Sequence, residues 1–388
     1  MKRLFVFAVS VILALLPVVT ACAGQIDMHE IDAQVDQFFQ KGRATGGALV
    51  VMRHGEIVYQ RYYGYSTKRS KTPVTADTYF RSASVTKMIS AIGIMQLYEQ
   101  GKVNLDQDIS TYFGYEIANP HHPGIPITLR QIMSHTTSIS QAGGFSSAKN
   151  TIYNMLSKDA RRPANFTDNA PGSKYSYSNF GAGLMGSIME AAAQVSVNRY
   201  MRENVFAPLD IDAAYNACCL EHPEHVASIY KNGSLFRSAA KFISDPYDDF
   251  PDPESHYRIT VGELFIRAAD LAKLGAVLCG DGSYNGVRLL NPESVNLMRM
   301  NQAELNASVT AHSPYGLSVS RINNLAEGKT VYGHHGLYNG SMTLLAFDPE
   351  TEFVFVMLSN GCSQVRKGRI GVLPRNLFEY VYPLFTKK

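Results

Sequence analysis

The sequence predicts an α/β (α+β) fold in which an antiparallel β-sheet is flanked by helices and a mostly helical lobe is inserted into the middle of the chain. Strand-like segments lie near both ends of the 388 residues, and the sequence between them is mostly helical and rich in loops. Hydrophobic residues make up 45% and charged residues 18%, as in an ordinary globular protein. We therefore expect one sheet assembled from both ends of the chain, with the lobe inserted at about 115–255.

Each element of this fold is predicted from hydrophobic spacing. Apolar residues over 31–39 recur at helical intervals on one side. Two runs rich in β-forming residues, 48–53 and 56–62, are joined through His54-Gly55, which indicates a hairpin. The remaining elements are a helix over 84–100, a second hairpin formed by 342–347 and 352–358, and a C-terminal helix over 375–385.

The N-terminal segment is typical of an export signal. Met1-Lys2-Arg3 precedes an almost unbroken apolar run over 4–19. Ordinary signal peptidase would fit Ala21-Cys22-Ala23, whereas 19–22 resembles the lipobox of bacterial lipoproteins, in which Cys22 becomes the lipidated first residue. A retained anchor is a third reading, but the run is short of the roughly 20 residues of a spanning helix. We expect a signal peptide over 1–21, a lipoprotein signal being favoured, and a periplasmic or extracellular domain over 25–388 that is attached to the membrane if Cys22 is lipidated.

Charge and cysteine content exclude two further classes of protein. The formal net charge is only +3 and no Lys/Arg block stands out after the signal, so nucleic acid is not an expected partner. Besides Cys22, the four cysteines are too few for a disulfide scaffold. Cys218, Cys219, His222 and His225 lie close together, but their spacing matches no standard zinc site, and Pro223 breaks any helix that would align the histidines. We expect no metal.

Ser84 begins the helix that we expect to be buried. Val85, Met88, Ile89, Ile92 and Met95 follow it at helical spacing, and Lys87 lies one turn from Ser84 on the same face. Ser84 would ordinarily be a helix cap, but a lysine at the third following position faces the positive end of the helix dipole. Burial there would lower the pKa of the lysine and let its neutral amine accept the serine proton.

The pattern S-x-x-K is weak by itself, because the chain repeats it at Ser146/Lys149, Ser228/Lys231 and Ser238/Lys241. Ser84 and Lys87 differ in being followed by Tyr177-Ser178-Asn179 within 171–181 and by His334-His335-Gly336 within 333–340. With these three motifs in this order, the chain resembles the superfamily of class C β-lactamases, D-alanyl-D-alanine carboxypeptidases and serine esterases, the penicillin-recognising serine hydrolases. The segments 130–137, 205–209, 269–272 and 284–290 resemble further landmarks of that family.

The resemblance implies a β-lactamase/transpeptidase-like fold and a role for each motif residue. Ser84 would be the nucleophile, Lys87 its activating partner, and Tyr177 a shared general base and acid whose pKa the lysine lowers. Asn179 would orient Lys87 and the substrate, and His334 would line the substrate side of the cleft. Gly336 completes the third motif, and the backbone N–H groups of Ser84 and Leu337 would form the oxyanion hole. His135 and His335 are assigned structural roles.

The third motif also bears on which substrate is expected. Dedicated β-lactamases of the family carry lysine at the position of His334, and histidine is only partly charged near neutral pH. We therefore expect an acyl-enzyme hydrolase of the D,D-carboxypeptidase or esterase type, acting on peptidoglycan stem peptides or esters without a cofactor. A class C-type β-lactamase and a penicillin sensor without turnover remain alternatives. Substrate choice is expected to depend on the loops over 138–150 and 215–257. Ser138 stands where the family has glycine, which leaves the conformation of its loop open.

Overall fold

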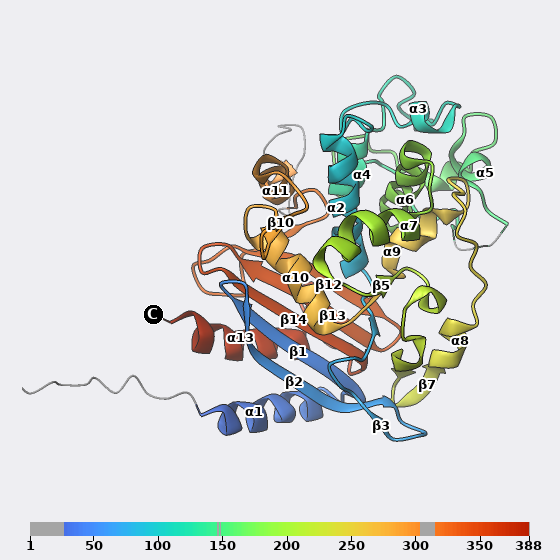
Figure 1. Ribbon diagram of the computed structural model, residues 1–388. Coiled ribbons are helices and arrows are strands. Elements are labelled where there is room, and N and C mark those ends of the chain that lie inside the picture. The colour runs from blue at the N-terminus through green and yellow to red at the C-terminus, as the bar shows by residue number, and fades with distance from the viewer. Residues whose placement is uncertain (1–26, 146, 148, 303–314, 388) are drawn as a thin grey trace, which may run out of the picture.

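The computed structural model describes residues 27–145, 147, 149–302 and 315–387. The expected signal segment, Cys22 and Ser146 lie outside these residues. In the described chain, no helix is both long and apolar enough to cross a membrane. The architecture is a large antiparallel sheet with helices on both faces, as predicted (Figure 1).

The main sheet is built from strands of both ends of the chain. Its seven strands follow one another in space in the order β11 (Ser320–Ile322), β12 (Val331–Tyr338), β13 (Ser341–Asp348), β14 (Phe353–Gly361), β1 (Gly46–Arg53), β2 (Glu56–Thr67) and β3 (Thr72–Pro73). The predicted hairpins are β1–β2 and β13–β14, and β14 pairs with β1 to join the two ends of the chain.

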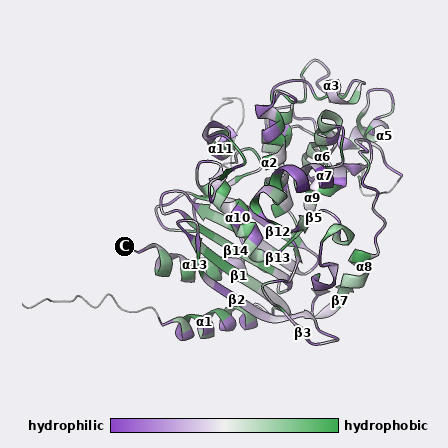
Figure 2. Ribbon diagram, viewed as in Figure 1, coloured by the Kyte–Doolittle hydropathy of each residue, from purple (hydrophilic) through white to green (hydrophobic). Residues whose placement is uncertain are grey.

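Both faces of this sheet are buried, because successive side chains of a strand point to opposite faces. In β1, Val50 and Met52 pack into the core beneath the helical part of the molecule, whereas Leu49 and Val51 pack into a second core beneath α1 and α13. Helix α1 (Met28–Lys41) and helix α13 (Val372–Thr386) lie together on that outer face (Figure 1). The central strands are accordingly hydrophobic along most of their length (Figure 2).

The opposite face carries α10 (Ala268–Cys279), which packs on β14, β1 and β13, and α2 (Val85–Glu99). Helix α2 contacts α6 (Asn179–Ala193), α9 (Ile259–Gly262) and strand β12. Twelve of its residues are buried, which confirms the expected burial of this helix. Helix α2 thus lies between the sheet and the helical part of the chain, and its first turn faces β12.

The remaining elements are short. The helices are α3 (Ser110–Phe113), α4 (Leu129–Ser134), α5 (Ile152–Leu156), α7 (Val197–Met201), α8 (Ala239–Ile243) and α11 (Pro292–Arg299). Small sheets are formed by β4 (Phe80–Arg81), β8 (Phe265–Ile266) and β5 (Ala213–Ala214), by β6 (Ile229–Lys231) and β7 (Ser234–Arg237), by β9 (Ser283–Tyr284) and β10 (Val287–Arg288), and by β15 (Arg366–Lys367) and β16 (Ile370–Gly371). Short 3-10 or π-type turns connect several of them, among them η6 (His256–Arg258).

Candidate active site

The backbone before Ser84 is fixed from two sides. The Ser82 carbonyl accepts a hydrogen bond from Thr343 Oγ1 on β13 at 2.8 Å. Ala83 has φ +49°, a left-handed conformation that is unfavourable for a residue with a side chain. A Cβ at Gly336 would lie 2.7 Å from the Ser82 carbonyl oxygen and 2.9 Å from Ala83 Cβ. Gly336 is therefore needed for the close approach of β12 to the turn that presents Ser84.

Ser84 stands at the N-terminus of α2 but does not cap it, because its side chain makes no capping hydrogen bond. Its hydroxyl instead lies 3.1 Å from Lys87 Nζ. A second hydrogen bond of Nζ, 2.6 Å long, goes to the carbonyl of Val261 in α9. Lys87 is completely buried, and among the described residues no carboxylate forms an ion pair with it. Burial, aided by the nearby charge of Arg81, lowers the pKa of Lys87 to about 7. A large fraction of the amine is therefore neutral at neutral pH.

Tyr177 reaches the same point from the loop before α6. Lys87 Nζ lies 5.4 Å from the centroid of its ring. The loop is held by His135, whose carbonyl accepts a hydrogen bond from Ser176 N at 2.8 Å and whose Nδ1 accepts one from Ser178 N at 3.4 Å. Burial, together with the charge of Lys87, lowers the pKa of His135 to about 3, so its neutral ring is free to accept that bond. The ring of His135 also packs 4.2 Å from that of Tyr177, centroid to centroid.

The expectation that the neighbouring lysine lowers the pKa of Tyr177 is wrong. Desolvation of its hydroxyl by the surrounding residues raises the pKa of this phenol although 40% of Tyr177 is exposed, and a hydrogen bond with Ser84 only partly offsets that effect. The charge of Lys87 is not among the causes that shift this pKa, and the neighbouring Tyr175 raises it further. Lys87 is thus the group poised to be unprotonated at neutral pH, and Tyr177 holds its proton.

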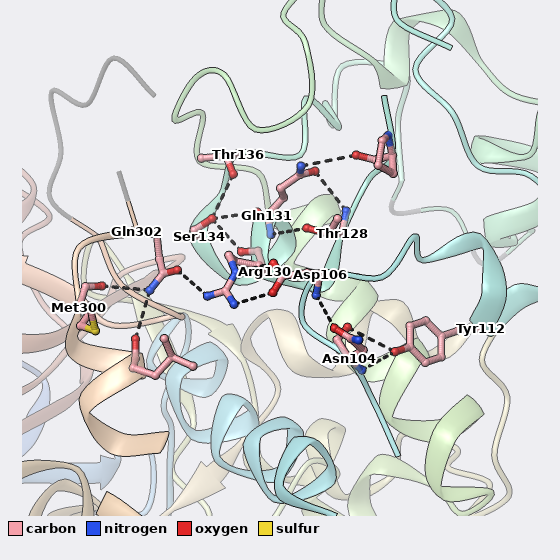
Figure 3. Close-up of polar contacts among 12 residues, drawn as sticks. Asn104, Asp106, Tyr112, Thr128, Arg130, Gln131, Ser134, Thr136, Met300 and Gln302 are labelled. Carbon is pink, nitrogen blue, oxygen red and sulfur yellow. Dashed lines mark hydrogen bonds and ion pairs between the residues drawn. The ribbon is translucent and has the colours of Figure 1, made fainter. Parts of the chain in front are cut away.

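Figure 3 shows how α4, the helix that ends at His135, is anchored. Arg130 makes two hydrogen bonds to the carboxylate of Asp106, at 2.6 and 2.8 Å, and a third to Gln302 at 3.0 Å. Thr128 caps the helix in a capping box with Gln131. His135 follows with φ +58° and turns the chain toward Tyr177. This network fixes the position from which His135 holds the tyrosine loop.

Ser138 adopts φ +64°, the conformation that would favour glycine. Its hydroxyl accepts a hydrogen bond from Asn119 Nδ2 at 2.9 Å. The same amide bonds the carbonyls of Thr167 and Asn169, so the strained turn is tied to a second segment of chain. The loop therefore keeps a glycine-like conformation although a serine occupies it.

Asn179 and His334 each bring an unpaired acceptor to the cleft. In the described structure, Asn179 Oδ1 is buried without a hydrogen-bond partner, and so is His334 Nε2. The other ring nitrogen of His334, Nδ1, lies 2.7 Å from the carbonyl oxygen of His335 and must donate to it, because a carbonyl only accepts. Burial lowers the pKa of His334 well below its ordinary value. His334 therefore presents a neutral ring with a lone pair on Nε2.

These side chains line one cavity of about 430 Å³. Ser84, Tyr177, Asn179, His334 and Leu337 all belong to its wall, so the structure brings the predicted site residues together. Further wall residues were not predicted from the sequence to line the cleft, namely Tyr175, Tyr315, Ser320, His335, Arg366, Gly368 and Arg369. The short run Arg366-Lys367-Gly368-Arg369 was the available signal for the last three.

None of the described residues over 138–150 and 215–257 lines this cavity, and the expectation that substrate choice depends on these loops stays a prediction. The first loop supports the site instead, because Gln141 accepts a hydrogen bond from Asn179 N at 3.2 Å. Part of the second packs around Tyr79 in a separate small core. In that second loop Cys218 and Cys219 are free thiols, with their Sγ atoms 3.8 Å apart.

Comparison with known proteins identifies the family. The family model described as Beta-lactamase matches residues 31–370. The chain belongs to this β-lactamase family. Among curated relatives, Protein flp of Staphylococcus aureus (strain N315) is 23% identical over 236 residues, which cover 61% of this chain and 47% of that protein. The chain thus spans about half the length of such a relative.

Solved structures of the β-lactamase fold agree with this assignment. The octameric penicillin-binding protein homologue from Pyrococcus abyssi superposes with a TM-score of 0.70, covering 92% of this chain and 77% of that one at 20% identity. A class C β-lactamase superposes with a TM-score of 0.70, covering 94% of this chain and 99% of that one at 18% identity. The D-amino acid amidase of Ochrobactrum anthropi SV3, complexed with D-phenylalanine, superposes with a TM-score of 0.67. The superposition covers 92% of this chain and 98% of that one at 19% identity. At these identities the likeness shows the fold, which is the β-lactamase/transpeptidase-like fold that the motifs imply.

Proposed function

We propose that this chain is a serine hydrolase that forms an acyl-enzyme at Ser84. The observation that carries this proposal is the Lys87 amine, which is fully buried, 3.1 Å from the Ser84 hydroxyl, and has a pKa of about 7. A buried lysine without a carboxylate partner is unfavourable for stability unless it is kept neutral. A neutral amine beside a serine hydroxyl is the arrangement that nucleophilic catalysis requires.

In the proposed acylation step, Lys87 Nζ accepts the Ser84 proton as Oγ attacks the substrate carbonyl. Its hydrogen bond to the Val261 carbonyl keeps the amine aimed while the new N–H bond forms. The N–H groups of Ser84 and Leu337 would stabilise the oxyanion. Tyr177 retains its proton at neutral pH and can donate it to the leaving group, after which Lys87 returns a proton to the phenol. Water then attacks the acyl-enzyme by the same route in reverse.

We propose D-amino-acid peptides, of the D,D-carboxypeptidase type, or esters as substrates. His334 supports the ester alternative, because its neutral ring offers an acceptor rather than a permanent positive charge for a substrate carboxylate at the third motif. Nε2 would pair with a hydroxyl or N–H donor of the substrate. The D-amino acid amidase, which shares the fold, was solved with a D-amino acid bound. Export to the periplasm or cell exterior, with attachment through a lipidated Cys22, would place the enzyme near peptidoglycan stem peptides and belongs to the same proposal.

Intact-protein mass spectrometry with product assays tests the proposed function. Wild type and Ser84→Ala would be mixed with a short-chain p-nitrophenyl ester, a D-Ala-D-Ala peptide and a penicillin. A Ser84-dependent adduct together with turnover of the ester or peptide supports the proposal. Fastest release of hydrolysed penicillin would instead identify a β-lactamase. A stable penicillin adduct with no turnover of any substrate would indicate a sensor, and no adduct in folded protein would contradict acyl-enzyme chemistry.

A further inference from the structure

Cys218 and Cys219 are neighbours in the chain, and their sulfur atoms are also neighbours in space. Both residues belong to the short turn η4 (Ala217–Cys219), and their Sγ atoms lie 3.8 Å apart. The two thiols are therefore in contact, although no bond joins them. Neither residue lines the catalytic cavity. The pair is thus a nucleophilic group that the proposed hydrolase chemistry does not use.

The backbone of η4 holds the two sulfur atoms near each other. The side chain of Asn216 accepts a hydrogen bond from Cys218 N at 3.1 Å, and its carbonyl accepts one from Cys219 N at 3.0 Å. Ala217 and Leu220, on either side of the pair, are buried in the small core that packs against α8. The turn is therefore anchored before and after the cysteines, and its geometry brings their thiols together.

The two thiols differ in their surroundings. Cys218 is exposed, whereas Cys219 is partly buried against the small core. Burial first, and then the charge of Cys218, raise the pKa of the Cys219 thiol to about 12. The nucleophile in thiol chemistry is an accessible thiolate. Cys218 is accordingly the thiol that meets an external reagent first, and Cys219 lies beside it as a second thiol.

The other two cysteines of the described chain lack such a partner. Cys279 and Cys362 are both buried. The thiol of Cys279 lies 3.9 Å from the carbonyl oxygen of Phe353, and that of Cys362 accepts a hydrogen bond from Ser359 Oγ at 3.5 Å. Protein groups thus surround each of them, and they provide an internal comparison for the reactivity of the pair.

We infer that Cys218 and Cys219 form a redox-active dithiol, which a small-molecule disulfide oxidises to a bond between the two adjacent cysteines. The Cys218 thiolate attacks one sulfur of the oxidant, forms a mixed disulfide and expels the other sulfur as a thiolate. Cys219 then loses its proton and its sulfur attacks Cys218 Sγ, which expels the second thiolate of the oxidant. The dithiol loses two electrons and two protons, and the oxidant gains them as two thiols.

The structure favours both the closure of this bond and its reversal. In the mixed disulfide Cys218 carries no charge, so the second cause of the raised pKa of Cys219 disappears. Consecutive Cα atoms lie only about 3.8 Å apart, closer than the roughly 4.4–6.8 Å that is usual across a disulfide. The bond is therefore strained and easily reduced, as in labile rather than structural disulfides. This chemistry goes beyond the proposed hydrolysis and does not depend on Ser84.

Thiol trapping followed by mass spectrometry and peptide mapping tests this inference. The reduced, folded protein would be incubated with excess glutathione disulfide, quenched with acid, unfolded and alkylated with N-ethylmaleimide. We expect the peptide that contains Cys218 and Cys219 to lose two hydrogens and to carry neither glutathione nor N-ethylmaleimide. Both thiols should disappear at least about tenfold faster than those of Cys279 and Cys362, which are buried. Unchanged alkylation of the pair, a stable glutathione adduct on wild type, or a disulfide between two chains would overturn the inference.

Single variants separate the roles of the two thiols. Cys219→Ser should stop at a stable glutathione adduct on Cys218, because no second thiol is there to displace it. Cys218→Ser should form an adduct at least about tenfold more slowly, since the remaining thiol is partly buried. Equal rates in the two variants would contradict the assigned order of attack. Ser84→Ala, which leaves η4 intact, is the control and should be oxidised at the wild-type rate.

Phenylarsine oxide gives a readout that needs no oxidant, because its arsenic bridges two neighbouring thiols. Wild type should retain this reagent against an excess of a monothiol and release it to a dithiol, as followed by intact-protein mass spectrometry. Neither Cys218→Ser nor Cys219→Ser should retain it. Failure of the folded wild-type protein to retain it would overturn the inference.

Discussion

Within the described part of the chain, two S-x-x-K segments begin helices, and their serine and lysine side chains make opposite kinds of contact. At α8, Ser238 caps the helix, because its hydroxyl accepts a hydrogen bond from Lys241 N at 3.2 Å, and Lys241 is exposed and faces Asp245. At α2, Ser84 makes no cap, and Lys87 is buried with its amine on the serine hydroxyl. The same four-residue pattern therefore yields an ordinary helix start at Ser238 and, at Ser84, the serine–lysine pair that we propose as nucleophile and base, and burial of the lysine is the difference between them.

The largest expected difference between the two segments is in catalysis. Ser84→Ala should lower kcat/KM for any turned-over ester by at least about 10³-fold, because no other group replaces the nucleophile. Ser238→Ala should leave kcat/KM within about twofold of wild type, since α8 does not line the catalytic cavity. Steady-state hydrolysis by both variants checks this. Comparable losses in the two variants would remove the distinction between the segments.

The pH dependence of the wild-type enzyme should report the state of Lys87. Its pKa is lowered to about 7, and only the neutral amine accepts a proton, so kcat/KM should rise with pH through about 7 and then level off. Below that midpoint the rate should fall about tenfold per pH unit. Lys87→Arg should lose most of its activity, and its kcat/KM should no longer rise with pH through about 7, because the guanidinium does not deprotonate. A profile that falls with rising pH across this range would contradict a neutral lysine base.

Arg81 offers a way to move that midpoint. Its guanidinium lies 3.5 Å from the centroid of the Tyr338 ring and pairs with Glu263 at 2.6 Å, and its charge is the second cause of the low pKa of Lys87. Arg81→Gln should shift the ascending limb of kcat/KM toward higher pH, by about half a unit. Arg288→Gln, which removes an exposed arginine paired with Asp281, is the control. An unshifted limb in Arg81→Gln would show that burial alone sets the pKa.

The smallest expected effect is on stability. Here Ser238→Ala should have the larger effect and Ser84→Ala the smaller, the opposite of their effects on catalysis. Ser238→Ala removes a helix cap and should lower the free energy of unfolding by about 1 kcal/mol. Ser84→Ala removes no cap, so its loss should be smaller. Urea unfolding of both variants measures the difference. A larger loss in Ser84→Ala would mean that Ser84 has a stabilising role beyond its contact with Lys87.

The sequence could predict what depends on local patterns. Apolar spacing over 31–39 and 84–100 predicted α1 and α2, and turn residues predicted both hairpins. The order of the three motifs selected Ser84 over Ser238, although the two share the same local pattern. The placement of strands at both ends of the chain predicted a single sheet, and the pairing of β14 with β1 is how the two ends join. Predicting these features requires only the periodic spacing of apolar side chains and the identity of a few residues.

Features that depend on contacts between distant segments could not be predicted. The raised pKa of Tyr177 depends on desolvation of its hydroxyl by the residues around it, and the tautomer of His334 depends on the carbonyl of His335. The hydrogen bond from Arg369 of the β15–β16 hairpin to Tyr175 in the wall of the catalytic cavity joins segments whose meeting no spacing encodes. The glycine-like turn at Ser138 depends on Asn119, nineteen residues away.

Direct titration of Lys87 tests most directly the claim that burial turns this lysine into the base. Lysine labelled with ¹³C at Cε would be incorporated, and the signal that disappears in Lys87→Arg would be followed by NMR from pH 5 to pH 11. We expect this signal to titrate with a midpoint near pH 7, as burial requires. A midpoint near the ordinary lysine value of about 10.4 would contradict the claim, because the amine would then be charged when Ser84 must lose its proton.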